Sequence, residues 1–218
     1  MVNKKKTEEK KVVGDSKKKI SKRDRKENRF LKNMFILLGI VLIGILLGFL
    51  VMKEAGDFEY RGVKFSVVEF CDAKPCLKTY STKVPVIYQG QSADYNFYLR
   101  NDPRDLDKKI SFDGELQLAK KMFIDITFDR NCRGYESVAM DNFGTLMKVA
   151  GIDVESDKNQ SCNYTGEDMY VLIQEGEETE IVQFGPACYN INIKECEIIS
   201  GTERFMTEVF VKLNETAN

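Results

Sequence analysis

The chain has 218 residues, with 33 Lys and Arg against 34 Asp and Glu and a formal net charge of −1. It contains no histidine, which excludes Ser–His–Asp and Cys–His nucleophiles and any metal held by imidazole. The near-zero net charge conceals an uneven distribution. The first 33 residues hold 14 basic and 5 acidic side chains, whereas residues 53–218 hold 19 and 29.

The N-terminal segment, residues 1–33, has no aromatic side chain before Phe30. No apolar face of helical period runs through it, so we expect a basic, disordered cytoplasmic tail. Its charges favour contact with the anionic headgroups of membrane lipids. Because no aromatic side chains are interleaved for base stacking, no specific nucleic acid is expected as a partner.

An uncharged apolar run follows from Met34 to Met52. Its length predicts a transmembrane signal-anchor helix. Basic residues precede the run and acidic residues follow it, which predicts a cytoplasmic N-terminus and an extracytoplasmic C-terminal part at the plasma membrane. A cleaved signal peptide is the alternative, but the run is longer than the ~7–15 residues usual for its apolar region.

The predicted chain therefore has five parts. In order, they are the tail (1–33), the helix (34–52), a linker (53–56), an extracytoplasmic α+β domain (57–214) and a C-terminal tail (215–218). Within the predicted helix, Gly44 and Gly48 form a G-x-x-x-G pattern that lets two helices pack closely. This pattern suggests a homo-oligomer, although glycine is common in membrane helices in general.

All six cysteines follow the predicted membrane helix. On the outer side they meet an oxidising compartment, where an even number predicts disulfides. Six cysteines allow 15 pairings, and the sequence does not choose among them. The simplest hypothesis joins nearest neighbours. Its pairs are Cys71–Cys76, Cys132–Cys162 and Cys188–Cys196.

Three Asn-x-Ser/Thr sequons, at Asn159, Asn163 and Asn214, lie in the same part of the chain. They are candidate acceptors of N-linked glycans. The first two flank a cysteine in a polar stretch that predicts a surface loop. Short sequons also arise by chance, so occupancy stays open.

Alternating and β-branched runs predict a strand-rich outer domain. The first strand, over 58–70, is interrupted at Gly62, and the runs 84–88 and 95–99 are expected to form a hairpin. The predicted strands are 58–70, 84–88, 95–99, 110–112, 115–118, 122–128, 169–173, 180–184 and 189–193.

Two segments have helical spacing instead. Between Ala139 and Ala150, apolar residues recur every three or four positions, which predicts an amphipathic helix ending at Gly151. Near the C-terminus, Ser200-x-x-Glu203 matches a capping box. One apolar face follows it, with a strand as the alternative. The whole pattern predicts an α+β domain with about two helices.

Candidate chemistry is sparse. Arg100 and Arg104 flank Asn-Asp-Pro and could contact an anion together, unless they pair with the abundant acids of the same domain. The acidic stretch 153–159 begins like a calcium loop but has lysine where the loop needs glycine. We therefore predict no catalytic residue, no cofactor and no metal ligand from the sequence.

The segments Tyr95–Arg104, Phe184–Cys196 and Gly201–Met206, together with the basic tail and single apolar run, resemble uncharacterised single-pass membrane-anchored proteins of small-genome archaea. The resemblance implies an archaeal cell-surface setting. It implies no activity and no functional residues.

These observations favour a membrane-anchored binding or structural module of the cell envelope, with an envelope protein as one expected partner. Two alternatives stay open. One is a surface-anchored hydrolase that uses carboxylates, and the other is an accessory subunit of a membrane complex joined through its transmembrane helix. We expect a binding module rather than an enzyme.

Overall fold

The computed structural model describes residues 32–46, 56–72, 74–88, 90–128, 131–156 and 160–217. The chain divides into two compact units, Met1–Ala55 and Gly56–Asn218. The predicted basic tail lies outside the described residues except for its last two positions. The two units are described separately below.

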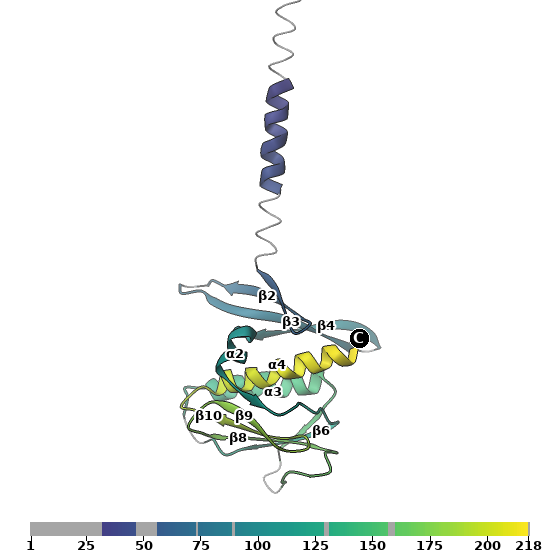
Figure 1. Cartoon of the computed structure of the whole chain (residues 1–218), viewed down its shortest axis with the longest axis vertical. Coiled ribbons are helices and arrows are strands. Elements are labelled where there is room, and N and C mark those ends of the chain that lie inside the picture. The colour runs from purple at the N-terminus through teal and green to yellow at the C-terminus, as the bar shows by residue number, and fades with distance from the viewer. Residues whose placement is uncertain are drawn as a thin grey trace, which may run out of the picture. The chain divides into compact units, whose positions relative to one another are not determined.

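In the first unit, residues 32–46 form a helix, drawn in purple in Figure 1. It covers the first part of the predicted transmembrane run, and residues 47–52 of that run lie outside the described residues. Among the described residues no helix is long and apolar enough to cross a bilayer. The prediction of a transmembrane helix is therefore wrong for this structure.

The second unit is an α+β fold in which helices lie between two sheets (Figure 1). Three helices belong to this unit, rather than the two predicted. They are α2 (Pro103–Lys109), α3 (Tyr135–Val149) and α4 (Ile198–Ala217). The short helix α2 was missed because seven residues give too little periodicity to detect. The predicted helix between Ala139 and Ala150 is confirmed as α3.

The first sheet has four antiparallel strands in chain order. They are β1 (Asp57–Tyr60), β2 (Val63–Phe70), β3 (Leu77–Tyr88) and β4 (Gln91–Leu99). The predicted single strand over 58–70 is two strands. Arg61 and Gly62, with φ of 48° and 84°, form the two-residue turn between them, a conformation that glycine favours and a tight hairpin requires. The predicted hairpin between 84–88 and 95–99 is confirmed.

The second sheet has six strands in the order β5-β9-β10-β8-β6-β7. Its pairs are parallel except for β9 with β10. The strands are β5 (Phe112–Asp113), β6 (Lys121–Ile126), β7 (Asp153–Glu155), β8 (Met169–Glu175), β9 (Glu180–Gly185) and β10 (Cys188–Ile193). The last three and β6 were predicted. Of the strand predicted at 110–112, only Phe112 lies in a strand, β5, because Ile110 is the C-cap of α2. The strand predicted at 115–118 is not formed, and the three-residue β7 was not predicted.

Helix α4 lies between the two sheets, and this position explains its burial (Figure 1). Every residue from Gly201 to Val211 is buried, so the helix has no solvated face and the single apolar face predicted for it is incomplete. Phe205 packs against Phe143 and Tyr189, whereas Phe210 packs against rings of the four-stranded sheet. The helix starts at Ile198, before the predicted cap.

All six cysteines form disulfides, as predicted, but only one nearest-neighbour pair is correct. Cys71–Cys76 closes the connection between β2 and β3. The other bonds are Cys132–Cys196 and Cys162–Cys188. The fold brings the start of α3 beside the turn before α4, so spatial proximity rather than sequence separation decides the pairing. Three disulfides indicate an oxidising environment, and hence an extracytoplasmic or secreted domain.

Candidate functional site

A fork between β2 and β3 is the first feature of the candidate site. The ladder between these strands runs from Phe70 opposite Leu77 to Ser66 opposite Ser81 and ends there. Beyond this point β2 continues in pairing with β1, and β3 continues in pairing with β4. The backbones of residues 63–65 and 82–84 thus form no ladder with each other. One hydroxyl bridges the fork, since Thr82 Oγ1 donates to the Lys64 carbonyl at 3.0 Å.

A cavity of about 630 Å³ opens at this fork. We call it the fork cavity. Its floor is formed by the C-terminal turns of α4 and the end of α3, and apolar side chains supply most of its surface. These apolar residues are Val63, Val84, Pro85, Val149, Ala150, Phe210 and Leu213. The volume lies within the range of roughly 300–1,000 Å³ that is typical of pockets for small ligands.

Polar groups gather at the rim of the fork cavity. Ser66, Ser81 and Thr82 supply hydroxyls, and Lys64 and Lys83 supply cationic side chains. Lys83 forms an ion pair with Asp94 at 3.6 Å, but both side chains are largely exposed, so the pair is weak. An apolar floor beneath a polar, cationic rim suits a ligand with an apolar body and an anionic or polar end.

A second cavity, the polar pocket, lies between α2 and the start of α4 and has a volume of about 610 Å³. Arg100, Lys109 and Lys194 line it together with carboxylates, including Glu178 and Glu197. Glu197 accepts a 2.5 Å hydrogen bond from the Thr179 hydroxyl. Three cations and four carboxylates line the pocket together, so no single charge of ligand is favoured there.

The predicted anion contact by Arg100 and Arg104 is not assembled. Arg104 donates to both carboxylate oxygens of Asp102, at 2.9 and 2.6 Å, and its guanidinium stacks 3.8 Å from the centre of the Phe58 ring. Arg100 lines the polar pocket and lies 5.8 Å from the centre of the Tyr135 ring. Of the two arginines, Arg104 pairs with an acid of its own domain, which was the alternative interpretation.

Carboxylates with raised pKa values would favour a hydrolase. Burial raises the pKa of the Glu203 carboxyl, which is 2 % exposed. Its oxygens, however, accept hydrogen bonds from the backbone of Arg100 at 2.6 Å and from the backbone and side chain of Asn101 at 3.0 and 2.7 Å. Glu203 therefore fixes the chain after β4, and it does not line the fork cavity or the polar pocket. In the polar pocket, the hydrogen bond from Arg104 lowers the pKa of Asp102.

A buried ion-pair network joins α4 to its neighbours. Arg204 donates to Glu208 at 2.5 Å, to Asp107 at 2.8 Å and to the Ile110 carbonyl at 3.1 Å. Arg61, in the turn between β1 and β2, donates to the same Glu208 carboxylate. Each of the three Arg204 nitrogens donates to a protein group, so the network joins α4 to α2 and to the first hairpin, and removal of one partner would leave a buried charge unpaired.

The remaining predicted sites have mixed outcomes. Gly48 and Asn159 lie outside the described residues, and Gly44 has open space around it, so helix packing stays a prediction. Asn163 lies in the loop before β8, and Asn214 lies on α4. Within the described parts of the chain, no group of three or more acidic or cysteine side chains is arranged to hold a metal ion.

Sequence reasoning missed the fork cavity. Its residues come from β2, β3, α3 and α4, which are brought together only by the tertiary fold. The one available signal was the interruption of the first strand at Gly62, which marks the hairpin from which the fork begins.

Comparison with family models, curated proteins and solved structures finds no match to this chain. No residue role can therefore be transferred from a relative, and the site rests on its own geometry.

Proposed function

We propose that the chain is an extracytoplasmic binding module that holds a small amphipathic ligand in the fork cavity. The observation that carries the proposal is the combination of volume and lining. A cavity of about 630 Å³ has a largely apolar floor from α3 and α4, to which Asn214 and Thr216 add polar groups, and a rim of hydroxyls and lysines from the sheet. Such a combination binds an apolar body by exclusion of water and orients it by its polar end.

The fork adds polar groups that side chains alone would not supply. Residues 63–65 pair with β1 and residues 82–84 with β4 on their other edges, but across the fork the two strands form no ladder, and the Lys64 carbonyl is bonded there by the Thr82 hydroxyl instead. Backbone groups that have no ladder partner need water or a ligand as a partner. A carboxylate or hydroxyl at the end of a ligand can supply it.

The three disulfides support an extracytoplasmic setting. They also favour a rigid scaffold over a mobile one, because Cys71–Cys76 closes the connection between the two strands that form the fork. A rigid scaffold lowers the entropy cost of binding.

A binding module is favoured over the alternative of a carboxylate-dependent hydrolase. The buried Glu203 carboxyl is occupied by three donors from residues 100 and 101, and Asp102 is paired with Arg104. Asp102 shares the polar pocket with other carboxylates, but the hydrogen bond from Arg104 lowers its pKa, whereas a general acid needs a raised one.

The test uses decanoate, below its micellar concentration, as a probe with an apolar body and an anionic end. Full-length chain is titrated by calorimetry and by the shift of its unfolding temperature. Leu213→Trp fills the floor of the cavity with a larger ring, and Ile87→Trp places the same ring at the tip of the β3–β4 hairpin, where Ile87 is 83 % exposed. Because the chain has no tryptophan, each variant also reports its own folding by fluorescence.

We expect wild type and Ile87→Trp to bind decanoate equally, and Leu213→Trp to bind at least about tenfold more weakly. A tenfold loss corresponds to about 1.4 kcal/mol. Equal binding by both tryptophan variants, or no binding by folded wild type, would contradict the proposal.

A further inference from the structure

Two of the three sequons lie within the described residues, and the fold treats them differently. Both have the form Asn-x-Thr. Asn163 lies in an irregular loop between β7 and β8, whereas Asn214 lies inside α4. A sequon is only a requirement for N-glycosylation, so the conformation around each asparagine decides which one can react.

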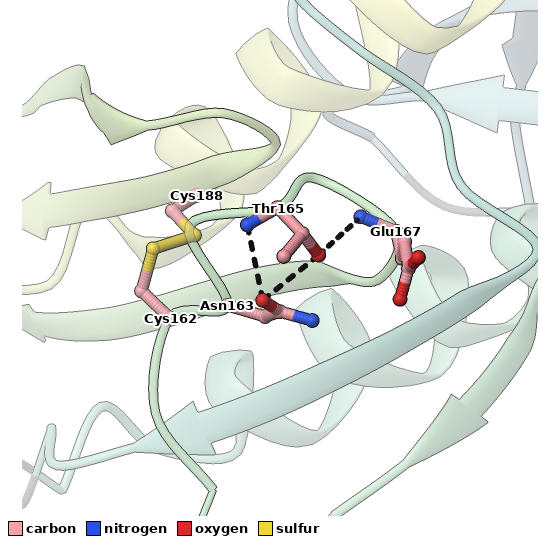
Figure 2. The surroundings of a disulfide bond; sticks show 5 residues. All are labelled: Cys162, Asn163, Thr165, Glu167 and Cys188. Carbon is pink, nitrogen blue, oxygen red and sulfur yellow. Dashed lines mark hydrogen bonds between the residues drawn. A yellow bond between two sulfur atoms is a disulfide. The ribbon is translucent and has the colours of Figure 1, made fainter.

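At Asn163 the side-chain oxygen is the acceptor of two hydrogen bonds from the sequon threonine. The backbone N–H of Thr165 donates to Asn163 Oδ1 at 3.0 Å, and the Thr165 hydroxyl donates to the same oxygen at 2.9 Å. Figure 2 shows both bonds, which converge on the side-chain oxygen of Asn163. That nitrogen forms no hydrogen bond with any residue that the structure describes.

This geometry bears directly on the reactivity of the amide. The nitrogen of an amide is a poor nucleophile because its lone pair is delocalised onto the oxygen. When Nδ2 loses a proton, negative charge develops on Oδ1, and two donors already aimed at that oxygen stabilise the resulting imidate. The donors are in place before the reaction, so they require no rearrangement.

The loop is also accessible. Asn163 itself is half-buried, but Tyr164, the middle residue of the sequon, is 72 % exposed, and Thr165 is exposed as well. On one side the sequon is tied down, because Cys162 is bonded to Cys188 of β10, as Figure 2 shows. The amide is thus presented from a fixed point on the surface, next to the six-stranded sheet.

We propose that Asn163 is the acceptor of an N-linked glycan, in preference to Asn214. The donor is a saccharide activated as a polyprenyl diphosphate. A bond forms between Asn163 Nδ2 and the anomeric carbon, the bond from that carbon to the diphosphate oxygen breaks, and the diphosphate leaves with the electron pair. The proton lost from Nδ2 passes to a base of the transferase. No oxidant or reductant is needed.

At Asn214 the exposure is similar, since this side chain too is half-buried and Thr216 is exposed, but the sequon hydroxyl has a different partner. That hydroxyl, Thr216 Oγ1, donates to the Leu213 carbonyl at 3.0 Å, as helical residues commonly do. The Asn214 amide nitrogen packs against Gly62, since a Cβ placed on that glycine would lie only 2.8 Å away. Asn214 also lines the fork cavity, so a glycan attached there would compete with space that the fold already uses.

A glycan at Asn163 is compatible with the proposed ligand site. Cys188 belongs to the six-stranded sheet, which lies on the far side of the helices from the four-stranded sheet that forms the fork (Figure 1). The glycan would therefore extend from the opposite layer and leave the fork cavity open.

The experiment expresses the full chain through the secretory pathway of a host that performs N-glycosylation. Intact mass is measured before and after enzymatic deglycosylation, and the modified residue is located by mass spectrometry of peptides. Asn163→Gln and Asn214→Gln form the matched pair. Thr165→Ser keeps the hydroxyl and Thr165→Val removes it, and each variant is checked for its unfolding temperature.

We expect glycan mass on wild type, Asn214→Gln and Thr165→Ser, and its loss from Asn163→Gln and Thr165→Val. Located glycan on Asn163 would support the proposal. An unmodified Asn163 in folded, secreted protein would overturn it, whether the glycan is found on Asn159, on Asn214 or nowhere.

Discussion

The two sheets of the folded unit are built in different ways. The four-stranded sheet joins strands that are consecutive in the chain, each antiparallel to the one before. The six-stranded sheet pairs mostly parallel strands drawn from Phe112 to Ile193. The first sheet rests on short-range contacts, and the second depends on the whole chain having folded around α3 and α4.

Their disulfides follow the same division. The bond in the four-stranded sheet spans 5 positions of sequence, whereas the two bonds beside the six-stranded sheet span 64 and 26. Exposure differs too. On the outer face of the four-stranded sheet, the ring centres of Phe70 and Tyr98 lie 5.8 Å apart, and the two side chains remain 47 % and 43 % exposed. Strands β8 and β10, in contrast, carry mostly buried side chains.

The difference indicates which part of the unit is the more resistant to unfolding. Long-range bonds and a closed core lie in the six-stranded sheet, so that sheet and its helices should be the last part to open. The four-stranded sheet, which divides at the fork above α3 and α4, carries the ligand site. The first prediction tests this division through α4, which both sheets share.

Phe205→Ala and Phe210→Ala remove similar rings from opposite sides of α4. The centre of the Phe205 ring lies 5.5 Å from that of Phe143 and 5.4 Å from that of Tyr189. The centre of the Phe210 ring lies 5.6 Å from that of Phe97. Each should lower the free energy of unfolding by about 3–5 kcal/mol, measured by urea denaturation.

Hydrogen exchange then separates the two. Phe205→Ala should reduce protection in both sheets, because it opens the last part to unfold. Phe210→Ala should reduce it chiefly in β1–β4. Identical exchange patterns in the two variants would mean that the sheets form one cooperative unit.

Paired removal of disulfides tests the same division through the unfolded chain. A bond that closes a longer loop restricts the unfolded state more strongly. With separations of 64 and 5 residues, the double variants C132A/C196A and C71A/C76A should lose about 4 and about 2 kcal/mol. Urea denaturation under non-reducing conditions measures both. A larger loss for the short loop would show that it stabilises the fork by direct contacts instead.

Sequence reasoning succeeded where structure is local. The hairpin of β3 and β4 and the strands β8 to β10 follow from alternation and turn residues, and α3 follows from its spacing. The disulfide of Cys71 and Cys76 was predictable for the same reason, since both ends lie in one short connection.

Prediction from the sequence was wrong or incomplete where segments far apart in the chain pack together. The partners of Cys132 and Cys162 depend on the packing of α3, β10 and α4. Glu203, which was predicted to complete a capping box, and its neighbour Arg204 are 2 % and 4 % exposed, because this part of α4 lies between two sheets and has no side facing water. The fork cavity has the same origin.

Glu203→Gln tests the role assigned to this buried carboxyl. The carboxylate accepts from three N–H groups of residues 100 and 101, but a glutamine has one oxygen and turns an NH₂ group toward a donor. We expect a loss of about 1–3 kcal/mol in the free energy of unfolding. Asn101→Ala, which removes only one of the three donors, is the control and should cost less. Equal losses would show that the backbone donors contribute little.

The smallest expected effect concerns Asp102, which joins the end of the four-stranded sheet to α2. Its side chain caps the helix by accepting from Arg104 N at 3.0 Å, and its ion pair with Arg104 lowers the pKa of the carboxyl. A depressed carboxyl pKa adds stability above the ordinary value of about 3.9, and this stability is lost as the pH falls through the lower pKa of the folded state.

Asp102→Asn keeps an oxygen for the cap but removes the charge, whereas Asp102→Ala removes both. At pH 6 we expect losses of below about 1 kcal/mol for asparagine, because the Arg104 side chain is 48 % exposed, and of about 1 kcal/mol or somewhat more for alanine. The difference between wild type and Asp102→Asn should shrink as urea denaturation is repeated at pH values from 6 down to 3 and below. A difference that stays constant over this range would assign the contribution of Asp102 to the cap alone. Its ion pair with Arg104 would then add nothing to the stability of the junction between β4 and α2.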